Sequence, residues 1–335
     1  MAILSTMTPL KRNLLLGGVT IGSAYGLVAY FFMMKLGGLP TVAFLALVPL
    51  AMGAIPQLFS DEDQVKNYLY VLFAPWLSIA GVFMVLFATL REATLCLLIL
   101  GSPFILAALL GTLIATVVRG LVIRSRKRKA VAATLMLLPF VFLGLEKRYL
   151  VREQPVEVRS STVVTASAQE VFDHLAEFDT IRSDEYQPGF FNQIGVPRPI
   201  RATVDHKGLG GHRTGVFERG LVFREVITEY DAPHTMAFSI DVDPTVLATS
   251  STERHALENG YFRFVDARYQ IDDLGDGRVQ LDLSSTYVAK SSVNAYGELW
   301  ASAIIEDFQD RVLGVLQRRL EKKAAPAPRE VASRP

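Results

Sequence analysis

The stretch AVAATLMLLPFVFLGLEKRYLVREQPVEVRSSTVVT, residues 130–165, changes character within a few positions. Ala130–Leu145 is a continuous apolar run, whereas Val156–Thr165 alternates and is rich in Val and Thr, which is typical of a β-strand. Residues 1–148 are apolar throughout apart from short charged breaks, and residues 151–323 have the composition of a water-soluble α+β domain. The chain therefore joins a membrane region to a folded soluble module.

Length and composition agree with this division. The chain has 335 residues, enough for about two domains at roughly 150 residues each. Half of the residues are hydrophobic, and the net charge is only +1, so no overall positive field attracts nucleic acid. The single cysteine, Cys96, lies in an apolar run and excludes an intrachain disulfide, which leaves the cellular compartment open.

The N-terminal part contains five segments that could form membrane-spanning helices, each needing about 20 apolar residues. These segments are Asn13–Met34, Pro40–Phe59, Tyr68–Leu90, Leu95–Val118 and Ala130–Leu145. The second holds Pro49 and Pro56 and is a candidate for a kinked or re-entrant helix, and the fifth is short. None of the five contains a charged residue or a histidine, which argues against an ion-coupled transporter.

The distribution of basic residues predicts the orientation in the membrane. Lys11 and Arg12 precede the first segment, and a cluster of five basic residues lies within 124–129, between the fourth and fifth segments. With five spans both groups fall on the cytoplasmic side, which places the N-terminus in the cytoplasm of a bacterial cell and the soluble domain in the periplasm. If the fifth segment does not cross, the soluble domain is cytoplasmic instead.

Three small residues repeat in the first segment at four-residue spacing, namely Gly18, Gly22 and Gly26. Such a repeat lines one face of a helix and lets two helix backbones approach closely. The simpler interpretation is packing inside this chain's own bundle, and the alternative is the seam of a homo-oligomer.

The soluble part reads as strand, helix, strand meander and long helix. Ser167 can cap a helix that runs to about Phe178, with Glu170 completing a capping box. Strands are predicted at the following positions: 156–165, 200–206, 212–219, 221–230, 234–242, 261–272 and 278–288. The last helix spans Val293–Lys322 and presents an apolar side toward one face of the sheet. The tail 324–335 is rich in Ala and Pro and is expected to be disordered.

This order resembles the helix-grip fold of the START/Bet v 1-like (SRPBCC) superfamily. The resemblance is carried by Val163–Leu175 (VVTASAQEVFDHL), by the hairpin Leu274–Val279 (LGDGRV) and by the closing amphipathic helix, and it covers roughly residues 155–322. The opening resembles the branch of polyketide cyclases and lipid-transport proteins. The fold class implied is an α-helical membrane bundle followed by an α+β domain whose antiparallel sheet wraps a long C-terminal helix.

The resemblance implies a hydrophobic ligand held between the sheet and the long helix. Apolar residues of the helix and the strands are the candidate ligand contacts, together with one inward-pointing arginine. They are Tyr296, Trp300, Ile304, Phe308, Met236, Phe238, Tyr269, Leu283, Tyr287 and Arg213. For each residue taken singly, plain core packing is the alternative interpretation. Phe190 and Phe191 lie in the long connection 179–199 and are candidates for a lid or gate, or for contact with the membrane.

Charged residues on the central hairpins have two interpretations. An inward Arg213 could bind a carboxylate or phosphate, whereas the simpler interpretation for Arg213 and Glu225 is a solvated outer face with cross-strand pairs. Asp307 and Arg311 are expected to pair within the last helix. His206 and His212 flank a glycine-rich turn, and two histidines alone make a weak metal site. We predict no metal, no cofactor and no catalytic residue.

The leading hypothesis is a protein that binds, and in one version transfers, a hydrophobic small molecule or lipid next to the bilayer that anchors it. Its partners would be that molecule and the lipid bilayer, not nucleic acid. The alternatives are a cyclase- or hydrolase-like enzyme acting on a hydrophobic substrate, and a membrane-tethered sensor or scaffold.

Overall fold

The computed structural model describes residues 9–36, 41–60, 67–89, 94–121, 128–242 and 257–324. The chain divides into two compact units, each described separately below: one built on residues 1–153 with the short segments 248–261 and 290–295, the other on the remaining residues. Residues 325–335 of the tail predicted as 324–335, most of the connection 243–260 and residues 124–127 of the basic cluster lie outside the described residues, whereas Ala324 is the last residue of the C-terminal helix.

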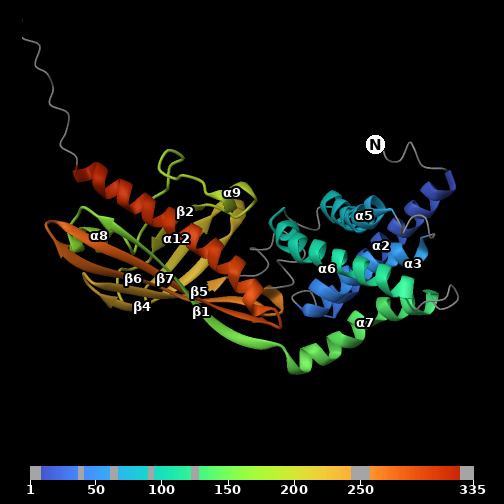
Figure 1. The fold of residues 1–335 in the computed structure, drawn as a ribbon. Coiled ribbons are helices and arrows are strands. Elements are labelled where there is room, and N and C mark those ends of the chain that lie inside the picture. The colour runs from blue at the N-terminus through green and yellow to red at the C-terminus, as the bar shows by residue number, and fades with distance from the viewer. Residues whose placement is uncertain are drawn as a thin grey trace, which may run out of the picture. The chain divides into compact units, whose positions relative to one another are not determined.

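The first unit is a bundle of apolar helices (Figure 1). It consists of α2 (Pro9–Lys35), a π-helical turn η1 (Ala43–Leu47) that continues into α3 (Val48–Phe59), α5 (Tyr68–Ala88), α6 (Thr94–Leu121) and α7 (Arg128–Tyr149). In the described part of the chain four helices, α2, α5, α6 and α7, are long and apolar enough to cross a membrane. The predicted second span corresponds to the shorter helix Ala43–Phe59. The N-terminal part is thus a membrane region.

Side-chain contacts give the direction of each helix. Tyr30 packs on Phe44 and Gly18 packs on Pro56, so α2 and α3 are antiparallel. Phe44 packs on Phe104, while the guanidinium of Arg119 donates to the carbonyl of Gln57 over 2.6 Å, so α3 and α6 are parallel.

The other two helices run with α2. Gly22 and Gly26 of α2 meet Ser78 and Val82 of α5. On α7, Met136 accepts a hydrogen bond from Tyr25 of α2, and Phe140 packs on Phe32. The five helices therefore alternate in direction along the chain, and α3 runs in the direction opposite to its neighbours α2 and α5 despite its short length.

Charged side chains from neighbouring helices cap both ends of the η1–α3 segment. At its N-terminus the buried carboxylate of Glu146 accepts hydrogen bonds from the backbone amides of Val42 and Ala43. At its C-terminus Arg119 donates to the carbonyl of Gln57 and to the hydroxyl of Ser60. A negative group at the N-terminal end and a positive group at the C-terminal end match the helix dipole. These contacts supply partners for terminal backbone groups that have none within the helix.

The three glycines of α2 pack inside the bundle of this chain. A Cβ added to Gly18, Gly22 or Gly26 would lie 3.2 Å from Pro56 Cα, 2.8 Å from Ser78 Oγ and 2.7 Å from Met52 Sδ, respectively. The repeat therefore serves the close approach of α2 to α3 and α5.

The tightest approach in the bundle joins α3 and α6, and it yields a prediction. A Cβ on Gly53 would lie 1.9 Å from the carbonyl oxygen of Ala108. Gly53→Ala must push the two backbones apart, and we expect a loss of stability of about 1–3 kcal/mol, measured as a lower thermal midpoint of the full chain in detergent. Gly144→Ala on α7 is the matched control, because a Cβ there meets nothing within 4 Å. Equal midpoints for the two variants would contradict the close contact.

The second unit is a seven-stranded sheet with a long helix across it (Figure 1). Its strands are β1 (Arg152–Val164), β2 (Pro199–Val204), β3 (His212–Phe217), β4 (Val222–Asp231), β5 (Thr235–Val242), β6 (Phe262–Gly275) and β7 (Arg278–Ser291). The order is β1-β7-β6-β5-β4-β3-β2, in which β2 to β7 form an antiparallel meander and β1 lies beside β7. This arrangement confirms the predicted helix-grip class.

Two short helices lie between β1 and β2 in the sequence, and a long helix follows β7. The short helices are α8 (Ala168–Asp173) and α9 (Phe190–Gln193), and the long helix is α12 (Asn294–Ala324). Ser167 caps α8 by accepting from the amide of Glu170, as predicted, over 3.3 Å. The prediction that this helix reaches Phe178 was wrong, because α8 ends at Asp173. Residues 177–178 then extend, and Phe178 forms a bridge with Ala202.

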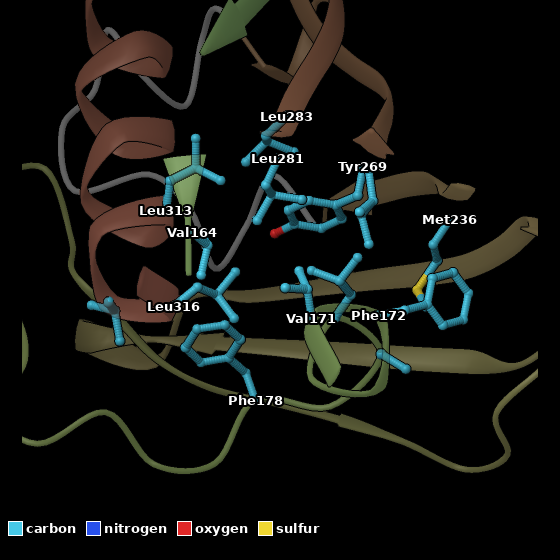
Figure 2. Packing of buried hydrophobic residues seen from close by; sticks show 14 of the residues in the cluster. Val164, Val171, Phe172, Phe178, Met236, Tyr269, Leu281, Leu283, Leu313 and Leu316 are labelled. Carbon is cyan, nitrogen blue, oxygen red and sulfur yellow. The ribbon is translucent and has the colours of Figure 1, made fainter. Parts of the chain in front are cut away.

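The core of the second unit lies under the C-terminal half of α12. Leu313, Leu316 and Leu320 on this half are all at most 1% exposed. Figure 2 shows Leu313 and Leu316 in one buried cluster with three residues from other parts of the unit. These are Val164 of β1, Phe178 of the segment after α8, and Leu281 of β7. The same cluster includes Val171 and Phe172 of α8, so the two helices and the sheet share one apolar core.

Candidate functional site on the inner face of the sheet

Aromatic rings from four strands and α12 form one connected set, here called the aromatic cluster. Its members are Phe217, Phe223, Phe262, Phe264, Tyr287 and Phe308. The rings contact one another in a chain that starts at Phe308, and the ring centroid of Phe217 lies 5.8 Å from that of Phe308 and 4.5 Å from that of Phe223. The contacts continue from Phe223 to Phe264 over 5.2 Å and from Phe264 to Phe262 over 4.9 Å. Phe262 stacks on Tyr287 with a centroid distance of 5.1 Å. The cluster therefore links β3, β4, β6 and β7 to the long helix.

The N-terminal half of α12, which faces this cluster, is less enclosed than the C-terminal half. Trp300, Ile304 and Phe308 are only partly buried, and so are Phe223 and Phe264 on the strands. The residues that follow on α12, such as Val315 and Leu316, are at most 1% exposed. Solvent thus reaches large apolar side chains at one end of the sheet–helix interface, while the other end is closed.

A buried ion pair joins β3 and β4, the two strands that carry Phe217 and Phe223 of the aromatic cluster. Arg213 and Glu225 stand opposite each other on β3 and β4, and their side chains form a salt bridge in which both are less than a tenth exposed. The guanidinium also donates to the carbonyl of Ala176 over 3.1 Å and lies over the ring of Phe238 at 4.8 Å. Burial opposes the charge on Arg213, but the attraction and hydrogen bond of Glu225, together with the interaction with Tyr269, raise the pKa of Arg213.

This pair corrects one interpretation of the sequence. The solvated outer face expected for Arg213 and Glu225 was wrong, because both side chains point into the domain. The cross-strand pairing itself was correct. With the guanidinium bonded to Glu225 and to Ala176, its charge is compensated inside the protein, as a buried charge requires. Burial also raises the pKa of the neighbouring phenol of Tyr269.

The connection between α8 and β2 is held to α12 by charged side chains. Glu185 is buried and accepts from Arg319 over 2.9 Å, while Arg318 donates to the Glu185 carbonyl over 2.7 Å. Arg319 also donates to the carbonyl of Thr180. Further along, Gly189 lies against the carboxylate of Asp307, which pairs with Arg311 as predicted, over 3.0 Å.

The far end of this connection is tied to the turn between β3 and β4. Arg198 pairs with Glu218, and Arg219 donates to the carbonyl of Gly195 over 3.0 Å. Between the two attachments, α9 carries Phe190 and Phe191, whose rings meet edge to face at 5.4 Å. Phe190 is 57% exposed, and Phe191 is partly buried. The candidate lid is thus the short helix α9, with the exposed ring of Phe190, on a connection that is attached to the rest of the domain at both ends.

The structure separates the predicted ligand contacts into two groups. Met236, Phe238, Tyr269 and Leu283 belong to the closed core. Trp300, Ile304 and Phe308 lie at the less enclosed end together with the partly buried Tyr296. Tyr287 is fully buried between the two groups, and its hydroxyl lies 3.0 Å from that of Ser302. Ligand contact by any of these residues stays a prediction.

Sequence reasoning missed four members of the aromatic cluster, Phe217, Phe223, Phe262 and Phe264. A signal was present for Phe223, because Phe223, Glu225 and Ile227 alternate along β4 and so share one face. The pairing of Gly215 with Phe223 across β3 and β4 was not visible, because register depends on the turn at Glu218–Gly220.

The strand order, the long helix across the sheet and the half-open aromatic end define a helix-grip domain. A family model described as polyketide cyclase/dehydrase and lipid transport matches residues 155–321. This part of the chain is a START/Bet v 1-like (SRPBCC) domain.

Solved structures with similar coordinates include a START superfamily protein from Mycobacterium smegmatis, at 13% identity and a TM-score of 0.35 over 50% of this chain and 98% of that one. Zhui aromatase/cyclase from Streptomyces sp. R1128 matches at 15% identity and a TM-score of 0.35, over 52% and 99% of the two chains. Norcoclaurine synthase from Thalictrum flavum matches at 14% identity and a TM-score of 0.33, over 52% and 99%. A comparison with curated proteins gave no match.

The attachment at Glu185 predicts a dependence of stability on pH. The hydrogen bond from Arg319 lowers the pKa of Glu185 in the folded protein, although burial works in the opposite direction. A lowered pKa means that the stabilisation is complete above the unfolded value of about 4.3 and is lost as pH falls through the folded pKa. Glu185→Gln should therefore destabilise the full chain by about 1–3 kcal/mol at pH 7, and by progressively less below about pH 4.

The measurement is the thermal midpoint of the full chain in detergent across this pH range. Glu157→Gln provides the control, because Glu157 pairs with Arg159 on the surface with both side chains more than half exposed. Such pairs contribute about 0–1 kcal/mol. A difference between wild type and Glu185→Gln that stays constant down to pH 3 would contradict the assignment.

Proposed function

We propose that this protein binds a hydrophobic small molecule or lipid beside the membrane that anchors it. The ligand would lie against the aromatic cluster and the N-terminal half of α12. The observation that carries the proposal is a contrast between apolar side chains along α12: Trp300, Ile304 and Phe308 stay partly exposed, whereas the apolar residues of the later turns, such as Leu313, Val315 and Leu316, are buried. A family description that names lipid transport, matched over residues 155–321, supports the same chemistry.

The energetics favour an apolar occupant. Each methylene group moved from water into an apolar site contributes about 0.8 kcal/mol, and an aromatic side chain offers about 150–250 Å² of surface. Partly exposed aromatic residues on the inner face of a sheet therefore provide a large driving force for burying a hydrocarbon or a ring system. The membrane anchor would supply such molecules at high local concentration.

Binding is a better fit than catalysis for the polar groups near the cluster. Arg213 is bonded to Glu225 and to the carbonyl of Ala176, and the hydroxyl of Tyr287 is bonded to that of Ser302. General acid–base catalysis needs a group positioned on the substrate's reacting atom, and these side chains are instead occupied by one another. Their arrangement supports a rigid wall for the ligand.

The proposal predicts that filling the half-open end reduces binding. Ile304→Trp should weaken binding of an apolar naphthalene probe to the full chain in lipid nanodiscs at least about tenfold, because the added ring takes the ligand's place. Leu299→Trp is the control on the same helix, since Leu299 is 65% exposed. Probe fluorescence measures binding relative to empty nanodiscs, and thermal midpoints check folding. Equal affinities for a folded Ile304→Trp variant and wild type would overturn the proposal.

We also infer that the soluble domain faces away from the cytoplasm. The alternating helix directions support five passes, with the start of α2, the end of α6 and the start of α7 at one end of the bundle and the C-terminal end of α7 at the other. In the sequence, Lys11 and Arg12 belong to the start of α2, and the basic residues within 124–129 follow α6 and open α7. Basic residues in short connections mark the cytoplasmic side. The chain that continues from α7 into β1 therefore emerges on the opposite side.

This orientation predicts which positions a membrane-impermeant maleimide can label in intact cells. In a Cys96→Ser background, Leu209→Cys in the exposed β2–β3 turn should react from outside the inner membrane. Ser125→Cys in the basic connection should react only after permeabilisation. The reverse pattern would place the soluble domain in the cytoplasm.

A further inference from the structure

We propose that the bound molecule carries a neutral hydrogen-bond acceptor oxygen, such as a ketone, ester, ether or alcohol, which the indole Nε1 of Trp300 binds. This inference rests on the proposed function and names the chemical class of its ligand. It excludes as preferred ligands both pure hydrocarbons, which offer no acceptor, and anionic amphiphiles, which require a compensating cation.

The first observation is the state of the indole donor. The Nε1 atom of Trp300 is buried, and no atom of the described residues accepts a hydrogen bond from it. Tyr and Trp side chains that bury their polar atom almost always give it a partner, because a buried unsatisfied donor is destabilising. The donor therefore has its binding capacity intact in the folded domain.

The second observation is the position of Trp300 on α12. Residues four apart lie on the same side of a helix, so Trp300, Ile304 and Phe308 form one row. Phe308 at the end of this row packs on Phe217 of the aromatic cluster. The eight-residue separation places Trp300 about 12 Å along the helix axis from Phe308. A molecule lying along the row would have its apolar part on Phe308 and its oxygen at the indole.

The third observation concerns the charge of the ligand. A carboxylate or phosphate needs a cation, and Arg213, the buried basic side chain of the described residues, is already neutralised by Glu225. An indole is a neutral donor with a single N–H. The site is therefore matched to a neutral oxygen, which the indole can bind without leaving an uncompensated charge in an apolar setting.

The test compares two probes that differ by one oxygen. One is an acyl-dimethylaminonaphthalene, whose emission moves to the red when its carbonyl accepts a hydrogen bond, and the other is the alkyl analogue without the carbonyl oxygen. Each is titrated against the full chain in lipid nanodiscs, with empty nanodiscs subtracted. Trp300→Phe removes the N–H and keeps an aromatic ring, while Trp76→Phe in α5 controls for loss of a tryptophan elsewhere.

We expect Trp300→Phe to weaken binding of the ketone about fivefold, as one net hydrogen bond predicts, and to abolish the extra red shift. Binding of the alkyl analogue should be unchanged, and Trp76→Phe should alter neither probe. Equal weakening of both probes by Trp300→Phe, or no effect on either, would overturn the inference while leaving hydrophobic binding intact. If neither probe binds the wild-type protein, the proposed function fails as well.

Discussion

The packing of α12 against the sheet is the interaction on which the soluble domain depends. Leu313, Leu316 and Leu320 bury one side of the helix in a core that also contains residues of β1, β7 and the segment after α8. In the N-terminal half of the same helix, Ile305 is buried but Trp300, Ile304 and Phe308 are only partly covered. The same helix thus completes the core and forms one wall of the candidate site. The position of that wall is therefore set by the packing of α12 in the core.

Polar contacts set the borders of that site. The buried Arg213–Glu225 pair joins two strands and the end of α8 on the inner side. On the outer side, Glu185 and the arginines of α12 hold one end of the connection that carries α9. Breaking a buried pair leaves an uncompensated charge, which is far more destabilising than the pair is stabilising. These contacts therefore give the half-open end a defined shape, and the aromatic side chains between them form the apolar surface of the candidate site.

The membrane unit obeys a different constraint. Between helices in lipid there is little hydrophobic driving force, so close backbone packing and satisfied polar groups decide the arrangement. Gly53 and Gly111 allow α3 and α6 to touch, and Glu146 and Arg119 complete the ends of the η1–α3 segment. Glu146 and Arg119 lie just outside the predicted apolar segments, yet they are part of the bundle, because α7 and α6 extend a few residues further than apolar composition indicates.

Local patterns were sufficient for the element order, the helix-grip class, the membrane region and the cap at Ser167. Alternation, apolar run length and capping chemistry act over a few residues, and the sequence contains them in full. They were insufficient for the direction in which Arg213 and Glu225 point and for the meeting of Phe217, Phe223, Phe264 and Phe308. Which face of a strand becomes the interior depends on register and on what packs against it, and a shift of one residue exchanges the faces. The amino-acid sequence by itself therefore determined which elements form, and only the tertiary structure decided which side chains meet inside them, because that depends on contacts between residues far apart in the chain.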